Sequence, residues 1–442
     1  MNTQRTVTII GGGIAGLSAA VFLTEKNFKV ELLEASPKLG GRAYSFFDKE
    51  RDRFFDNGQH ILAGWYKNTF EYLKIIGSHD KLNFQKNLEI NFVNTEKKVY
   101  KLRCPDAAPP MNLLYGLLKF KAFDLKDKFA LKNIMSLLND DIDHDRFANT
   151  AELLKSLKQT YNVVKYFWEP FILAVFNTQP EKVSVRVFLN VLKTGFNEKS
   201  SSTLVIPDVN LNELLVDPAV KYFEKNDVKV ILDRTVKQIV TGEGTVVHLS
   251  LDDDTKINSD FYISAVSFFA FKRLFNENVY LKNNYRSEFL KASGIVSVHI
   301  FFETKIPEKL IQDNSFGMTG LIGTIVQWIF KRNENHLSLV ISGADDLQIT
   351  EMSSEDIYKL CIKDLMQTIT GFDKLKISGY KVIKEKRATF IPDNATNEFR
   401  PKQKTDYDNF FIAGDWTDTD LPATIESAVS SAKWCVEEIV KS

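Results

Sequence analysis

The clearest pattern of apolar and polar positions lies in the first forty residues of the chain. Residues 7–10 form a short β-branched run, residues 17–26 carry apolar side chains at helical spacing, and residues 30–33 form a second apolar run. Two such runs on either side of a helix are typical of a β-α-β unit with parallel strands. Ser36 and Pro37, which follow, predict the start of a further short helix.

The remaining pattern predicts an α/β protein built from alternating segments. Residues 109–139 and onward to about 195 have helical spacing, residues 204–265 alternate strands and helix, and residues 293–345 contain three strand-like runs. A helix is predicted near 354–369, and a last strand precedes a long final helix. We predict a discontinuous nucleotide-binding domain (1–75, 204–265 and 396–442), interrupted by a mainly helical insert (76–203) and a sheet insert (266–395).

Composition narrows the class of protein. The 442 residues exceed what one hydrophobic core usually serves. Lys+Arg and Asp+Glu both number 57, so no general charge favours a nucleic-acid partner. Three distant cysteines and scattered histidines predict neither a disulfide framework nor a metal site. The first residues lack a signal-peptide pattern, and the uncharged stretch 7–23 contains four glycines, so we expect a cytoplasmic protein without a membrane span there.

A glycine-rich motif, G-x-G-x-x-G, follows the first strand and opens the first helix. Its glycines allow a tight turn, the approach of a pyrophosphate, and close packing of helix on strand. An acid 18 residues beyond the motif ends the second strand, where it can accept hydrogen bonds from ribose hydroxyls, and it argues against a 2′-phosphate. The alternative is a glycine-rich loop without a nucleotide. The expected dinucleotide contacts are Gly11, Gly13, Ile14, Ala15, Gly16, Glu34 and Ala35.

A second strand-to-helix turn near the end of the chain distinguishes FAD from NAD. Gly414 would let a ligand approach, and Asp415 can accept a hydrogen bond from the ribityl chain of a flavin. An ordinary turn is the alternative. No second G-x-G-x-x-G occurs, so a separate nicotinamide domain of the usual kind is missing. Further expected cofactor contacts are Gly40, Gly41, Arg42, Val236, Ala423, Thr424 and Ile425, of which Arg42 can neutralise the pyrophosphate or be a surface cation.

Three stretches carry a resemblance to a known family: LEASPKLGGR, DNGQHILAGWYKN and AGDWTDTDLPATIESAV. They resemble the flavin amine-oxidase and phytoene-desaturase-like superfamily. Within it, residues 168–192 and 204–230 are most similar to the squalene-associated FAD-dependent desaturases, which are hydroxysqualene dehydroxylases. Carotenoid desaturases share Gly58-x-His60 and Gly64-x-Tyr66, so that stretch alone does not separate the two families.

The resemblance implies a glutathione-reductase-like FAD-binding Rossmann domain with an inserted α+β substrate domain. It also implies that reduced FAD gives hydride to an allylic alcohol of a thirty-carbon isoprenoid, with loss of water, in squalene or hopanoid synthesis. A separate reductase or quinone would then be the electron donor. The implied walls of an apolar tunnel include Trp168, Phe171 and Phe176.

The stretch FFDNGQHILAG would, by the same resemblance, lie against the flavin ring with Asn57, Gly58 and Gln59 as contacts. His60 or Asp56 would then donate the proton to the leaving hydroxyl. The alternative is that both residues only hold the loop in shape. The role of Glu426, in PATIE, stays open.

Rival functions remain at this point: carotenoid or other polyene desaturation, amine oxidation, and a flavin-bound carrier of isoprenoids. Residues 111–138 add a question of location, since Leu113, Leu114, Leu117, Leu118 and Phe120 lie among lysines. Such a segment can rest on the anionic inner face of the cell membrane, or it can be a pair of core helices with solvated lysines.

Overall fold

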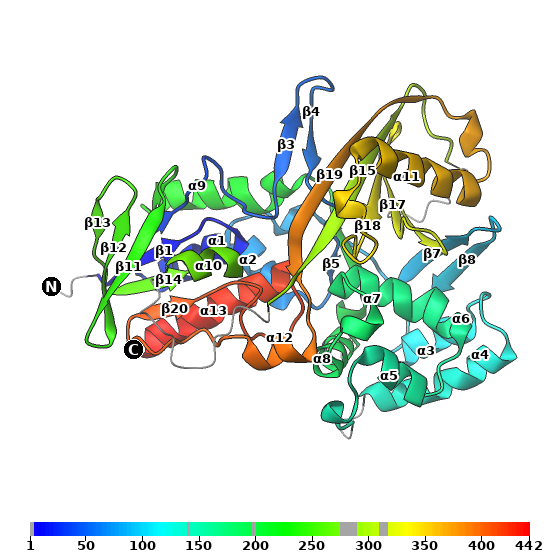
Figure 1. Cartoon of the computed structure of the whole chain (residues 1–442), viewed down its shortest axis with the longest axis horizontal. Helices are drawn as coiled ribbons and strands as arrows, with labels where there is room; N and C mark the ends of the chain where they lie inside the picture. The colour runs from blue at the N-terminus through cyan, green and yellow to red at the C-terminus, as the bar shows by residue number, and fades with distance from the viewer. Residues whose placement is uncertain (1–3, 139–141, 197, 199, 275–289, 309–316) are drawn as a thin grey trace.

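Five parallel strands from three separate stretches of the chain form one sheet, in the order β10-β2-β1-β14-β20 (Figure 1). The computed structural model describes residues 4–138, 142–196, 198, 200–274, 290–308 and 317–442. The strands are β1 (Thr6–Ile10), β2 (Lys29–Leu33), β10 (Lys229–Ile231), β14 (Phe261–Ser264) and β20 (Phe410–Ile412). Because all five run in the same direction, their carboxyl ends share one edge of the sheet.

Both faces of this sheet are covered. On one face α1 (Ile14–Thr24) packs against the C-terminal helix α13 (Ile425–Lys441), within a core that also takes residues from α2 and α9. On the other face lie α10 and an antiparallel sheet of β11 (Val236–Gly242), β12 (Thr245–Leu251) and β13 (Lys256–Ile257). α1 is apolar on every side because it is enclosed, and its one buried hydroxyl, on Ser18, donates to the carbonyl of Ile14 at 2.7 Å.

A second, seven-stranded sheet has the order β19-β15-β18-β17-β16-β7-β8. Its strands are β7 (Glu89–Asn94), β8 (Val99–Arg103), β15 (Ala292–Phe302), β16 (Met318–Ile322), β17 (Trp328–Asn333), β18 (His336–Ile341) and β19 (Ile377–Phe390). Alternate residues face opposite sides. Val298 and Ile300 of β15 pack in the core with α11 (Ser354–Thr368), whereas Ser297 and His299 face the other way.

The helices α3 to α8 form a lobe on the side of the seven-stranded sheet that is opposite α11 (Figure 1). The helices not yet given are α2 (Lys67–Ile75), α3 (Met111–Leu118), α4 (Leu125–Ala130), α5 (Thr150–Ser156), α6 (Tyr161–Val163), α7 (Glu169–Phe176), α8 (Val185–Gly195), α9 (Asp217–Lys225), α10 (Phe268–Leu274) and α12 (Asn394–Phe399). Within the described ranges, every helix is too short or too polar to cross a lipid bilayer.

Two small elements join the sheets. The hairpin of β3 (Ser45–Asp48) and β4 (Arg53–Asp56) stands over the seven-stranded sheet, where the ring of Phe55 packs on His299 and His336. A three-stranded sheet of β5 (Leu62–Ala63), β9 (Leu204–Pro207) and β6 (Leu82–Phe84) follows along the chain. The segment from 45 to 63 therefore runs from one large sheet towards the other.

The predicted α/β class is confirmed, with a parallel sheet of Rossmann type and a second mixed sheet. The short helix predicted after Ser36 is wrong: the Ser36 hydroxyl accepts from the backbone N–H of Lys38 at 3.2 Å and forms a turn. β7 and β8 lie in the segment predicted to be mainly helical, and β7 is a strand through its pairing with β16, more than 200 residues away. The five segment limits stay a prediction.

A pair of buried histidines lies between the hairpin and the seven-stranded sheet. Nδ1 of His299 is 2.9 Å from Nε2 of His336, so one nitrogen donates and the other accepts. Burial among Phe55 and Phe301, with the nearby charge of Arg332, lowers the pKa of His299 to about 4 and that of His336 to about 2. Both rings are therefore neutral at neutral pH.

We expect this pair to make the fold sensitive to acid. Since both pKa values lie below the ordinary value near 6.5, the unfolded chain binds protons that the folded chain does not. The free energy of unfolding should then fall as the pH drops from 6.5 towards 4, by about 1.4 kcal/mol per pH unit for each histidine. The free energy of unfolding, measured by urea denaturation between pH 8 and 5, should depend less steeply on pH in His336→Phe than in the wild type below pH 6.5. Above pH 7 the two proteins should show the same dependence on pH. Equal slopes at acid pH would contradict the assignment.

Candidate functional site

The carboxyl edge of the parallel sheet collects the sequence motifs expected to bind a dinucleotide. Gly11 follows β1 and donates its N–H to the carbonyl of Leu33 at the end of β2, at 2.7 Å. Ala413, after β20, donates to the carbonyl of Ser264 at the end of β14, at 2.9 Å. The glycine-rich loop therefore lies beside Glu34 on one side and in line with the Gly414 turn on the other. In open α/β sheets, ligands bind at such an edge.

The glycines of the loop have different roles. A Cβ built on Gly16 would lie 1.8 Å from the carbonyl oxygen of Gly11, so helix α1 approaches the turn too closely for any side chain. A Cβ on Gly13 would meet only the Cα of Gly41, at 3.9 Å, and Gly13 has an ordinary extended backbone. Protein packing thus requires Gly16 but not Gly13. The bare backbone at Gly13, at the N-terminus of α1, fits the close approach of a pyrophosphate.

Glu34 is fixed at the mouth of this loop by the backbone. Its two carboxylate oxygens accept from the N–H of Gly12 at 2.7 Å and from the N–H of Ser36 at 2.8 Å. Each oxygen keeps a lone pair that a ribose hydroxyl could use. Val236 is buried in β11 within the same core as Leu33, which fits an apolar wall near an adenine ring.

The segment Gly40–Gly41–Arg42 packs directly on the glycine-rich loop. Gly40 donates its N–H to the carbonyl of Gly12 at 2.9 Å and pairs as an isolated bridge with Gly13. Gly40 and Gly41 have φ of +103° and +59°, a conformation that side chains rarely adopt. These two glycines therefore bring the backbone that carries Arg42 against the expected pyrophosphate position.

Arg42 links this segment to the C-terminal turn. Its Nη2 is 2.5 Å from Oδ1 of Asp415, and its Nη1 donates to the carbonyl of Ala388 in β19 at 2.9 Å. Burial works against the charge of Arg42, but Asp415 and then Glu385 raise its pKa on balance. The two charged residues expected to serve the pyrophosphate and the ribityl chain are thus brought together and bonded to each other.

Arg400 holds the Asp415 turn in place, which the sequence did not reveal. Its guanidinium is buried and donates to the carbonyls of Asp415 at 3.0 Å and Leu421 at 2.9 Å, to the carbonyl of Thr417, and to the hydroxyl of Thr419 at 3.1 Å. Burial lowers the pKa of Arg400 to about 10, so it stays charged at neutral pH. No local pattern in FRPKQKT predicts these contacts, because the carbonyls that Arg400 bonds lie 15 to 21 residues further along the chain.

The start of α13 carries the last expected contacts, Ala423, Thr424 and Ile425. The hydroxyl of Thr424 accepts from the N–H of Ser427 at 3.1 Å and caps the helix. Glu426 has a structural role: its oxygens accept from the N–H of Asn68 at 3.0 Å and of Thr69 at 2.9 Å, in the first turn of α2. The buried carboxylate therefore fixes the N-terminus of α2 against that of α13.

The loop from 54 to 64 reaches the same place from the other side. Asn57 donates its Nδ2 to the carbonyl of Arg42 at 2.8 Å. Asp56 accepts from the hydroxyl of Ser45 at 2.7 Å and from the N–H of Leu211 at 3.0 Å. Both of these bonds are to Oδ1 of Asp56, and the guanidinium of Arg332 lies 3.7 Å from Oδ2, so each oxygen has a partner within the protein. The contacts of Asp56 hold the loop in shape; its proposed catalytic role stays a prediction.

His60 differs from Asp56 in its contacts. Nδ1 lies 3.1 Å from the carbonyl of Gly58, which favours a proton on Nδ1, and the structure describes no hydrogen bond for Nε2. Burial lowers the pKa of His60, and Asp56 partly opposes this effect. Near the same loop, a Cβ on Gly58 would lie 3.6 Å from the hydroxyl of Ser297, which is buried without a partner among the described residues. Gln59, the remaining expected contact, is half-buried.

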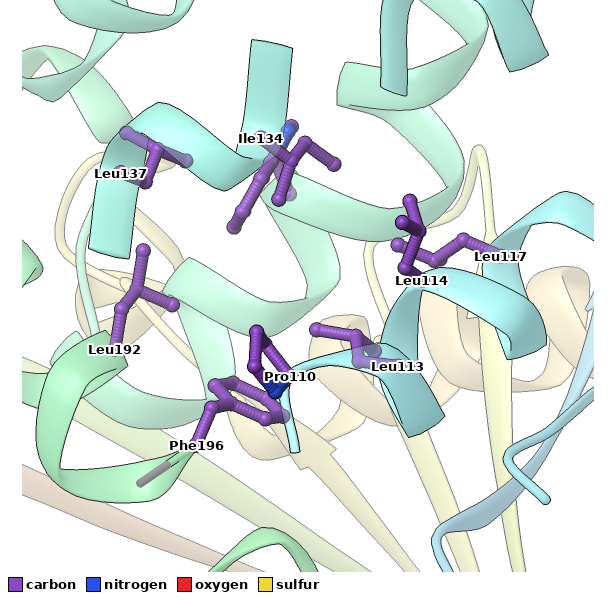
Figure 2. A pocket seen from close by; sticks show the side chains of 9 residues that line it. Pro110, Leu113, Leu114, Leu117, Ile134, Leu137, Leu192 and Phe196 are labelled. Atoms are coloured by element: carbon purple, nitrogen blue, oxygen red, sulfur yellow. The ribbon is translucent and has the colours of Figure 1, made fainter. Parts of the chain in front are cut away.

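The expected substrate residues lie in the helical lobe, and Trp168 lines an apolar cavity there. Figure 2 labels the other residues that line it. The indole N–H of Trp168 donates to Oε1 of Gln159 at 3.1 Å. The space inside is about 10 Å³, which is room for about one water molecule. Phe171 packs edge-on against Trp168, and Phe176 is buried against Phe188. The cavity is lined by Pro110, Leu113, Leu114, Leu117, Ile134, Leu137, Trp168, Leu192 and Phe196.

We expect Gly13→Ala and Gly16→Ala to fail in different ways. Gly13→Ala has space in the protein, so it should fold with a nearly unchanged melting temperature but bind FAD, the cofactor expected from the sequence, at least about tenfold more weakly. Gly16→Ala would clash with the Gly11 carbonyl and should lower the melting temperature or prevent folding. Thermal melts and FAD titration check both. Equal FAD affinity of Gly13→Ala and wild type would contradict the close approach of the pyrophosphate to the backbone of Gly13.

Glu34→Ala should lose FAD more readily than His60→Ala. Removing the carboxylate takes away a charged acceptor for the ribose and loosens the Gly12 backbone, which should weaken FAD binding by about tenfold to a hundredfold. The hydrogen bond that the structure describes for the His60 side chain is to Gly58 and not to the glycine-rich loop, so its variant should keep its flavin. The ratio of flavin to protein absorbance in the two purified variants is the measurement. Equal flavin content would count against these site assignments.

Comparison with known proteins agrees with this geometry. The family described as "Flavin containing amine oxidoreductase" matches residues 14–440. The hydroxysqualene dehydroxylase of Zymomonas mobilis is 28% identical over 96% of this chain and 96% of its own length. The 15-cis-phytoene desaturase of Capsicum annuum is 26% identical over 98% of this chain and 78% of its own length.

Solved structures share the whole fold. The crystal structure of an oxidoreductase from Methanosarcina mazei superposes with a TM-score of 0.74 over 99% of this chain and 100% of that one, at 14% identity. The match to the family extends from the glycine-rich loop to the last helix, and the cradle at Gly13, the acid at Glu34 and the Gly414 turn fit FAD. The chain therefore belongs to the flavin-containing amine oxidoreductase family and is an FAD-dependent oxidoreductase.

Proposed function

We propose that the protein acts on a long isoprenoid and converts hydroxysqualene to squalene with loss of water. The observation that carries this proposal is the end-to-end similarity to the hydroxysqualene dehydroxylase of Zymomonas mobilis, which covers 96% of both chains. The phytoene desaturase of Capsicum annuum has a further fifth of its length outside the match. The specific reaction belongs to this proposal and would place the enzyme in squalene or hopanoid synthesis.

The loop from 54 to 64 supports an apolar substrate because it touches both halves of the site. Asn57 is bonded to the Arg42 segment, and Ile61 packs against the core of the helical lobe. That core combines side chains of α3, α7 and α8 with Phe92, Trp328 and Phe330 of the seven-stranded sheet. A hydrocarbon chain in this region would end at the loop that carries His60. The cavity at Trp168 is too small for such a chain as it stands, so the helices around it would have to part.

FAD, when bound, supplies hydride transfer through its flavin ring. The protein must then exclude water and give a proton to the departing hydroxyl. We assign the proton to His60, whose Nε2 is not engaged by the described residues and whose loop adjoins Arg42. Asp56 keeps the loop in place through Ser45 and Leu211. The reducing equivalents would come from a separate reductase or quinone, since the sequence has no second dinucleotide motif.

Desaturation of a polyene is the second candidate, supported by the similarity to the phytoene desaturase of Capsicum annuum. It uses the same site with hydride moving in the opposite direction. Amine oxidation and a carrier role have no comparable support from the described residues.

The direct test mixes the purified holoprotein with lipid after anaerobic reduction by dithionite. With hydroxysqualene, we expect the flavin absorbance to return and squalene to appear in the extract in equal amount, one per flavin. Reduced protein that stays reduced with hydroxysqualene, while oxidised protein is bleached by phytoene, would move it to the desaturases. If neither reaction occurs, the isoprenoid assignment is overturned. A matched sample without lipid controls for oxygen leakage.

The pH dependence tests His60. Because its pKa is lowered, the protonated fraction grows as the pH falls from 8 towards 6, and kcat/KM should rise in that direction. His60→Gln should lower kcat by about a hundredfold or more and remove that rise. Its flavin content, measured on the same sample, should equal that of the wild type. A variant that keeps the wild-type pH profile would reduce His60 to a structural part of the loop.

A further inference from the structure

The outer sides of α3 and α4 expose large apolar residues that no described part of the chain covers. Met111, Tyr115 and Leu118 lie at i, i+4 and i+7 on α3, and Leu125 and Phe129 at i and i+4 on α4. Leu125 is 85% exposed and Phe129 is 73% exposed, the former the most exposed of the large apolar residues that the structure describes. We call these five residues the α3–α4 face. Soluble surfaces rarely gather such residues unless they bind something.

The two sides of α3 show why this is not ordinary core packing. Leu113 and Leu117 are fully buried in the core of the lobe, so the helix is apolar on its inner side as well. A helix that is apolar all round is normally enclosed on all sides. Phe120 and Phe123, in the short connection to α4, pack edge-on at 5.1 Å and are buried, which fixes one helix to the other. The outer side of α3 is therefore rigidly held and open.

The charges around the face are mostly positive. Between residues 111 and 132 the chain has five lysines and two aspartates. Asp127 is buried and accepts from Thr160 at 2.6 Å and Asn162 at 3.1 Å, and Asp124 caps α4. In the part of the chain that the structure covers, none of the five lysines forms an ion pair. The lysines are Lys119, Lys121, Lys126, Lys128 and Lys132.

The position of the face connects it with the substrate region. α3 and α4 belong to the helical lobe, at the end of the molecule away from the parallel sheet (Figure 1). Pro110, Leu113, Leu114 and Leu117 line the apolar cavity on the inner side of the same helix (Figure 2). Leu114 lines the cavity and is only half-buried, so α3 has residues on both the cavity and the surface.

We propose that the α3–α4 face docks on an anionic lipid bilayer, with the five apolar side chains below the headgroups and the lysines among the phosphates. The combination of an apolar centre with lysines that form no ion pair among the described residues fits a lipid surface better than a protein partner, which would need matching acids; Lys132 lies 4.8 Å from the ring centre of Phe129. Membrane binding stands apart from the proposed reaction; only the idea that a lipid substrate enters past α3 rests on that function.

The test is flotation of the full-length holoprotein with vesicles of phosphatidylcholine alone or with about one-third phosphatidylglycerol. We expect binding to the anionic vesicles and at least about tenfold weaker binding to the neutral ones. Leu125→Ser/Phe129→Ser, at two highly exposed positions, should bind about tenfold or more weakly. Lys121→Glu/Lys126→Glu should do the same and remove the preference for anionic lipid. Val247→Ser/Leu347→Ser, at exposed apolar positions elsewhere, is the matched control and should bind like wild type.

Several results would overturn the proposal. These are no flotation of the wild type, equal binding to both kinds of vesicle, or equal loss in the control pair. Light scattering of the same proteins without lipid distinguishes self-association: a dimer that Leu125→Ser/Phe129→Ser dissociates would make the face an interface between copies. Turnover of hydroxysqualene dispersed in detergent, measured on the same variants, separates failure of docking from failure of the reaction. If the docking proposal is correct, the variants that lose vesicle binding keep wild-type turnover in detergent.

Discussion

The contact between Arg42 and Asp415 joins the parts on which the site depends. Arg42 comes from the segment after the second strand, Asp415 from the turn after the last one, and the carbonyl of Ala388 from the long strand β19 of the other sheet. A planar guanidinium carries donors on separate nitrogens, so Nη2 bonds Asp415 while Nη1 bonds Ala388, whereas a lysine has a single nitrogen for all its donors. The interaction is 2.5 Å long and partly open to solvent on the arginine side, so it organises the site more than it stabilises the fold.

The two sheets divide the chemistry of the protein between them. The parallel sheet offers its carboxyl edge, bare glycine backbone and a fixed acid, which are what a dinucleotide needs. The mixed sheet offers a side of apolar and small polar residues, closed by the helical lobe. The loop from 54 to 64 is the place where both meet, because Asn57 is bonded to the first half and Ile61 packs in the second. The polar residues in this apolar stretch thus lie at the junction between the cofactor region and the apolar core of the helical lobe.

Prediction from the sequence went furthest where function requires short-range geometry. The glycine-rich loop, the Gly40–Gly41 pair and the Gly414 turn act through their own backbone, and the side chain of Glu34 bonds the backbone of near neighbours. All of them therefore lie within a few residues of strand ends that the apolar runs predicted. The roles of Arg400 and Glu426 were not predictable. Arg400 caps carbonyls 15 to 21 residues away, and Glu426 caps a helix more than 350 residues away. Long-range hydrogen bonds of this kind leave no periodic trace in a sequence.

The sequence by itself determined the α/β class and the family, because strand period, glycine spacing and turn chemistry are local properties. Tertiary structure alone decided three things. It paired β7 with β16 across more than 200 residues, buried His299 against His336, and left one side of α3 open while it buried the other. A pattern of leucines is the same whether both sides of a helix are covered or only one. Which side faces water is settled by what the rest of the chain packs against it.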